Sequence, residues 1–172
     1  MAQIFAFIPF GFFSLVMVTA TVSDITTMRI PNKLVLTLLG GYLVMVSFSE
    51  MTTSDVVGGL VAACAVFCLG FMAFACGWMG GGDVKLMSAT ALWLGLPQLP
   101  AFLFWTSVFG TIITLGLLVY RARPLPATLQ GQPHWALHLH RRATPVPYGA
   151  AIGPAAMLVF ASTPWKTVLA TF

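Results

Sequence analysis

The chain has 172 residues, of which 59% are hydrophobic and 7% charged, and its mean hydropathy is +0.94. Soluble domains carry about 25% charged residues, so this composition excludes an ordinary soluble domain and predicts a polytopic membrane protein. The net charge of +4 comes from basic residues that membrane orientation also explains, which argues against a nucleic-acid partner.

Six apolar segments follow one another along the chain. Their approximate ranges are 3–22, 34–48, 56–78, 84–96, 99–120 and 147–163. Open strand edges cannot be satisfied in hydrocarbon, and long unbroken apolar runs do not fit a β-barrel, so we expect helices. We predict an all-α bundle of about six transmembrane helices, forming one membrane-embedded domain over residues 1–172. The second and fourth segments are short for a span of about 20 residues, so they would extend, tilt or lie in thinned bilayer.

The basic residues predict the orientation of the bundle. No Lys or Arg precedes Arg29, so the first segment lacks the positive region of a signal peptide and is interpreted as a retained span. The basic residues concentrate on alternate connections, which marks that side as cytoplasmic and predicts both termini on the non-cytoplasmic side. Asp24 and Asp83 then lie at the cytoplasmic surface, while Glu50 and Asp55 lie at the opposite one.

Asp24 and Asp83 are the principal candidate site residues. A carboxylate near lipid costs about 2.5–3.5 kcal/mol, so an intramembrane acid is a functional candidate whose partner must be named. Two paired carboxylates can hydrolyse a peptide, because one takes a proton from water while the other polarises the scissile carbonyl and protonates the leaving nitrogen. Close carboxylates share a proton, so the acid and the base are not assigned individually.

Glycines and a lysine surround Asp83. Gly80, Gly81 and Gly82 come directly before it, and Lys85 follows two residues later. Glycine permits positive φ and close approach of a substrate strand, although a glycine run also serves as a flexible turn. The carboxylate at a membrane boundary favours the site-shaping interpretation. Lys85 either lowers the pKa of a nearby carboxylate or extends to the membrane interface.

A short motif of Arg29, Ile30, Pro31 and Asn32 follows Asp24. Pro31 suits a loop or the first turn of a helix. Arg29 is explained by cytoplasmic anchoring, and a site-shaping role for the motif beside Asp24 stays open.

Three motifs together resemble a known family. They are Asp24 with Arg29-Ile30-Pro31-Asn32, then Gly80-Gly81-Gly82-Asp83-Val84-Lys85, and then Val146-Pro147-Tyr148-Gly149-Ala150-Ala151. This combination is similar to the signature of type IV prepilin peptidases, which are membrane aspartyl proteases of the GxGD class. The resemblance implies that Asp24 and Asp83 are the catalytic pair, and that Gly80 and Gly82 are the fixed glycines.

The resemblance also implies a substrate and a location. Family members cleave the basic leader of a prepilin at the cytoplasmic membrane face, just before the hydrophobic helix. It implies residence in the bacterial cytoplasmic (inner) membrane among lipids, no cofactor or metal ion, and the pilus assembly machinery as a further partner. Large bifunctional members carry Cys-x-x-Cys pairs and also methylate the new N-terminus. This sequence has no Cys-x-x-Cys, so it resembles the short, peptidase-only branch of Flp/Tad-type pili, and no separate methyltransferase domain is expected.

Several remaining features are interpreted as structural. Tyr148 and Gly149 are taken as packing residues. The small residues Gly59 and Ala63, beside Gly58 and Ala62, fit close helix packing, and the tryptophans fit the membrane interface. Cys64, Cys68 and Cys76 are expected to pack within a helix rather than bind metal. His134, His138 and His140 lie in a basic loop suited to lipid headgroups or a partner.

Two alternatives to a peptidase remain. The first is a small transporter whose aspartates bind protons or cations, which predicts acidic groups near the bilayer midplane. The second is an assembly scaffold without catalysis, in which neither aspartate affects substrate length. Both alternatives differ from the peptidase in their response to substitution of the two aspartates.

Overall fold

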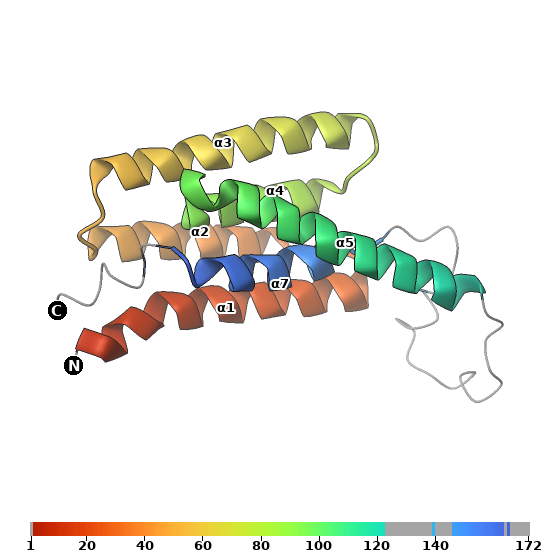
Figure 1. Cartoon of the computed structure of the whole chain (residues 1–172), viewed down its shortest axis with the longest axis horizontal. Coiled ribbons are helices and arrows are strands. Elements are labelled where there is room, and N and C mark those ends of the chain that lie inside the picture. The colour runs from red at the N-terminus through yellow and green to blue at the C-terminus, as the bar shows by residue number, and fades with distance from the viewer. Residues whose placement is uncertain (1, 123–138, 140–145, 164, 166–172) are drawn as a thin grey trace.

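The computed structural model describes residues 2–122, 139, 146–163 and 165, and their regular structure is helical throughout (Figure 1). The elements are α1 (Ala2–Thr27), α2 (Asn32–Ser47), α3 (Thr53–Ala75), α4 (Gly81–Leu94), the short 3₁₀ helix η1 (Leu96–Gln98), α5 (Leu99–Ala122) and α7 (Gly149–Phe160). The predicted all-α fold is confirmed. His134, His138 and His140 fall outside the described residues.

Three stretches are long and apolar enough to cross a membrane. They are Ile8–Thr27, Thr53–Ala75 and Leu96–Ala122. The apolar helices α2 and α7 are shorter, and α4 has only 14 residues. The chain is therefore a membrane-type helical bundle, while the number of six spans and the sides of the two termini stay predictions.

α4 lies inside the bundle. All of its residues from Asp83 to Leu94 are buried except Lys85. α4 can therefore be short, because protein rather than lipid covers most of its surface. α3 packs most extensively against it, and α2 and α7 cover other sides (Figure 1).

Glycines on α3 allow the close approach of α4. A Cβ atom at Gly59 would lie 2.7 Å from the carbonyl oxygen of Leu92, and one at Gly70 would lie 2.9 Å from the side chain of Val84. These glycines are about three helical turns apart and share one face of α3. The predicted helix contact through small residues is confirmed at Gly59.

The cysteines lie on the other side of α3. Cys64, Cys68 and Cys76 are all exposed, so the expectation that they pack inside a helix bundle is wrong. α3 turns Gly59 and Gly70 toward α4, whereas Cys64 and Cys68 line an open apolar groove between α3, α2 and α4 and so keep exposed surface.

An aromatic cluster joins the helices at the centre. Trp93 is 1% exposed, and its indole N–H donates to the carbonyl oxygen of Leu38 on α2 (3.0 Å). Trp165 is fully buried and donates to the carbonyl oxygen of Trp93 (2.8 Å). The rings of Phe13 and Phe160 pack against the indole of Trp93. The expected interfacial position is therefore wrong for these two tryptophans, because their N–H groups find partners inside the bundle.

Candidate active site

The two aspartates lie where three helices meet. α1 ends, and α4 and α7 begin, at the same end of the bundle (Figure 1). Asp24 lies in the last turn of α1 and is 5% exposed. Met28 stops this helix in a left-handed conformation (φ 54°), and its N–H donates to the carbonyl oxygen of Asp24 (2.9 Å). Pro31 then precedes α2 in an extended conformation.

The start of α7 holds the Asp24 carboxylate. The backbone N–H of Gly149, the first residue of α7, donates to Asp24 Oδ2 (2.7 Å). The backbone of Ala150 also hydrogen-bonds this carboxylate. Helix N-termini carry unpaired N–H groups and a partial positive charge, so they are suited to an anion. A Cβ atom at Gly149 would lie 2.8 Å from Asp24 Oδ2, so the contact depends on glycine at this position.

Asp83 is the third residue of α4 and is 9% exposed. Its carboxylate lies near the backbone N–H groups of Gly80, the residue before α4, and of Gly149, and both groups act to lower its pKa. The Gly149 amide therefore interacts with both carboxylates. The structure brings Asp24 and Asp83 together from positions 59 residues apart in the sequence.

Burial and mutual repulsion define the electrostatics of the pair. Asp83 lies outside the three apolar spans. Burial, followed by the negative charge of Asp24, raises the pKa of Asp83 from 3.8 to about 7, against the opposing effect of the backbone N–H groups. A proton is therefore held within the pair up to neutral pH, which is the state that general acid and base catalysis by two carboxyl groups requires.

A cavity of about 280 Å³ opens between the two aspartates. Its other lining residues are Met28, Gly77, Trp78, Met79, Gly80, Val146, Pro147 and Tyr148. A water molecule occupies about 30 Å³ in the liquid, so the cavity has room for water and part of a peptide. Within the described part of the chain, no third His, Cys, Asp or Glu joins the pair to form a metal-ligand group.

The predicted glycines have different positions. Gly80 lines the cavity, and a Cβ atom there would lie 2.8 Å from Asp83 Oδ2. Gly81 packs beside Phe74, and Gly82 packs beside Ile30. The site-shaping role of the last two is indirect, since they hold the start of α4 against α3 and the α1–α2 connection.

The remaining predicted residues lie beside the cavity rather than on its wall. Lys85 is exposed, and its Nζ donates to Asn32 Oδ1 (3.2 Å), which links α4 to the start of α2. Arg29 is exposed, and its carbonyl oxygen accepts from Ser23 Oγ (2.9 Å). Pro31 caps α2. These contacts position the helix ends that carry the aspartates.

Tyr148 and Gly149 are the residues that sequence reasoning undervalued. The sequence predicts packing roles for both, yet Tyr148 lines the cavity and the Gly149 amide donates to Asp24. The signal that could have found them is a glycine at the start of a predicted helix, because such a position offers free N–H groups to an anion.

Comparison with known proteins agrees with this geometry. Residues 11–115 match the type IV leader peptidase family. The chain belongs to this family. The matched region contains both aspartates, whereas Tyr148 and Gly149 lie beyond it. No solved structure matches the chain.

Relatives of this leader peptidase family member include proteins named prepilin leader peptidase/N-methyltransferase. That of Aeromonas salmonicida (strain A449) is 34% identical over 120 residues, which cover 64% of this chain and 41% of the relative. That of Pectobacterium carotovorum subsp. carotovorum is 36% identical over 100 residues, which cover 55% of this chain and 36% of the relative. The aligned part of this chain thus spans about two-fifths of the length of these curated relatives.

Proposed function

We propose that the chain is an aspartyl endopeptidase that cleaves the leader of prepilins at the cytoplasmic face of the bacterial inner membrane. One observation carries the proposal: Asp24 and Asp83, buried on different helices, line one cavity and both lie near the Gly149 amide, which donates to Asp24. Membership of the leader peptidase family supports the same conclusion.

In the proposed reaction, water occupies the cavity between the two carboxyl groups. The ionised carboxylate takes a proton from this water, whose oxygen attacks the scissile carbonyl carbon. The protonated carboxyl group polarises the carbonyl oxygen and stabilises its developing negative charge. Collapse of the tetrahedral intermediate breaks the C–N bond, and the leaving nitrogen receives a proton from the pair. No covalent enzyme intermediate forms.

The orientation of the bundle belongs to the same proposal. Six membrane segments with both termini outside would place Asp24 and Asp83 at the cytoplasmic surface. The short helices α2 and α7 would complete the spans through their flanks or through thinned bilayer. A basic leader would then remain on the cytoplasmic side while its hydrophobic helix stays among the lipids.

We further propose that residues 1–172 act as a single peptidase domain without methyl transfer. The absence of Cys-x-x-Cys supports this restriction. An Flp-like prepilin is the proposed substrate, and the pilus assembly machinery is the proposed recipient of the product.

The test is a cleavage assay with a tagged prepilin co-expressed in membranes. Asp24→Asn and Asp83→Asn are each expected to lower processing by on the order of 10³-fold, because either change removes a proton-transfer group. Glu50→Gln is the matched control, since Glu50 lies outside the cavity. Mass spectrometry of the new N-terminus identifies the cleaved bond. Normal processing by either Asp variant would contradict the proposal.

The alternative of a proton- or cation-coupled transporter makes a different prediction. Both aspartates lie at helix ends rather than in the middle of a long span, which favours the peptidase. Ion-coupled flux in liposomes, measured without any peptidase activity, would favour the transporter instead.

A further inference from the structure

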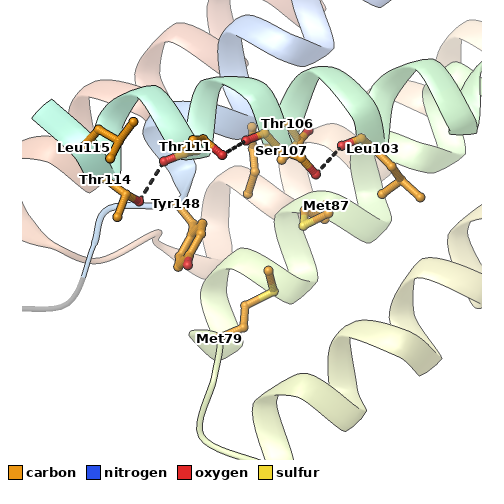
Figure 2. Close-up of a pocket in the computed structure, with 11 residues that line it drawn as sticks. Met79, Met87, Leu103, Thr106, Ser107, Thr111, Thr114, Leu115 and Tyr148 are labelled. Atoms are coloured by element: carbon orange, nitrogen blue, oxygen red, sulfur yellow. Dashed lines mark hydrogen bonds between the residues drawn. The ribbon is translucent and has the colours of Figure 1, made fainter.

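A groove of about 610 Å³ runs along α5 beside the candidate active site. On α5 it extends from Leu103 to Leu115, which is a length of about 18 Å at a rise of about 1.5 Å per residue. Figure 2 shows Met79, Met87 and Tyr148 facing this side of α5. The groove is therefore long enough for about three turns of another helix.

The groove is continuous with the cavity that contains the two aspartates. Met79 and Tyr148 line both of them. Met87 follows Asp83 by four residues, so the same face of α4 carries a carboxylate at the cavity and a groove residue one turn deeper. A helix lying in the groove would have one end at the aspartates.

One buried hydroxyl group in the lining of the groove has no hydrogen-bond partner within the described structure. Ser107, Thr111 and Thr114 each donate to a backbone carbonyl oxygen one turn earlier in α5, at 2.8, 2.8 and 2.7 Å (Figure 2). Thr106 is 9% exposed, and within the described structure its Oγ1 is buried without a hydrogen bond. An unsatisfied buried hydroxyl costs about 1–3 kcal/mol, and because this oxygen has almost no open surface, a ligand in the groove reaches it only if the Thr106 side chain rotates toward the groove.

We propose that this groove binds the hydrophobic helix of the precursor and presents its N-terminal end to Asp24 and Asp83. The proposal rests on the proposed function, since it names where that substrate docks. The small side chains of Ser107 and Thr111 allow a second helix to approach closely. After rotating toward the groove, the Thr106 hydroxyl donates to an oxygen atom of the docked helix. Lipid tails carry no such atom, so they fill the groove without satisfying Thr106.

The first test blocks the groove. Thr111→Trp is exposed enough to be accommodated, and its indole would fill the groove. Ile112→Trp is the matched control, because Ile112 is the next residue, is 59% exposed and does not line the groove.

With a full-length tagged prepilin we expect Thr111→Trp to raise KM at least tenfold and Ile112→Trp to leave KM unchanged. A soluble peptide of the same junction, lacking the hydrophobic helix, should be cleaved equally by both variants. Equal KM for the full-length substrate in both would overturn the proposal.

The second test does not depend on cleavage. A photo-crosslinking residue at position 107 or 111, in a chain that also carries Asp24→Asn, should crosslink to the hydrophobic helix of the prepilin. The same residue at position 112 should not. If position 107 or 111 crosslinks to the prepilin but the unsubstituted protein does not hydrolyse it, helix binding in the groove is supported and the proposed function is contradicted. Crosslinks from position 112 alone would overturn the proposal that the groove binds the precursor helix.

Thr106→Val tests the unpaired hydroxyl. Valine keeps the shape of threonine and removes its oxygen, so we expect a several-fold rise in KM for the full-length prepilin, no loss of thermal stability, and no change with the soluble peptide. An unchanged KM would contradict the hydrogen bond to the docked helix.

Discussion

At the scale of single residues, Gly149 has the most demanding position in the candidate site. Its N–H interacts with both carboxylates, and it lies so close to Asp24 that no side chain fits. The aspartates are recognisable from composition, because acids are rare in this chain. The residue that brings them together carries no charge and is distant in sequence, so only the folded structure identifies it.

Gly149→Ala is expected to lower kcat/KM for prepilin cleavage by on the order of 10²-fold, because the new Cβ displaces the Asp24 carboxylate and small misplacements of catalytic groups have effects of this size. The assay is prepilin processing in membranes. Gly116→Ala is the control, since a Cβ there meets nothing within 4 Å. Equal activity of the two variants would contradict the role assigned to Gly149.

The shared proton predicts a pH dependence. The pKa of Asp83 is about 7, so the pair loses its proton as the pH rises above neutrality. We expect kcat/KM to fall about tenfold per pH unit well above pH 7, because no carboxyl group remains to act as acid. A constant kcat/KM from pH 6 to pH 9 would contradict this assignment.

The same pKa predicts an effect on stability. The folded protein keeps the Asp83 proton up to about pH 7, whereas the unfolded chain loses it near pH 3.8. The folded state therefore binds more protons in this window, and its stability falls as the pH rises through it. Asp83→Asn removes this pH-dependent loss of stability. The variant should therefore have a higher melting temperature than the unsubstituted protein at pH 8, with a smaller difference at pH 5. Melting in detergent at both pH values checks this.

At the scale of helices, the position of α4 explains the site. Most of its surface is buried, and its N-terminus emerges at the end of the bundle where α1 stops and α7 starts. The sequence predicted a short apolar segment at 84–96 and left open how a segment of this length is accommodated. Burial by neighbouring helices removes the difficulty, because a helix surrounded by protein need not match the bilayer thickness.

Gly59→Ala should separate α3 from α4. Its Cβ would lie 2.7 Å from the Leu92 carbonyl oxygen, and backbone atoms cannot move away as a side chain can. We expect a loss of about 1–3 kcal/mol in the free energy of unfolding. Gly58→Ala is the adjacent control, because its Cβ would make an ordinary 3.8 Å contact with Leu96. Unfolding in mixed detergent compares the two variants, and equal stability would contradict the close contact.

At the scale of the whole molecule, Trp93 connects most of the helices. Its ring packs against Phe13 of α1, Tyr42 of α2 and Phe160 of α7. Such a centre allows a largely lipid-facing bundle to hold its helix ends in fixed positions, although many of its outer side chains are apolar and exposed. The geometry of the two aspartates depends on this rigidity.

Trp93→Ala is expected to destabilise the protein by about 3–5 kcal/mol, because it leaves a large cavity and removes the indole hydrogen bond to the Leu38 carbonyl oxygen on α2. Trp105→Ala, on the more exposed α5, should change stability far less. Thermal unfolding in detergent measures both. A smaller effect at Trp93 than at Trp105 would contradict the central role of the cluster.

The sequence by itself determined the membrane-type composition, the helical class and the two candidate aspartates with their flanking motifs. Those features follow from local chemistry: apolar runs, rare charges, and glycine beside an acid. Only the tertiary structure decided that the Gly149 amide interacts with both carboxylates, that Trp93 is central, and that the cysteines face outward. These properties depend on how each helix is rotated and where its ends meet, and such rotations are set by packing between segments distant in the chain.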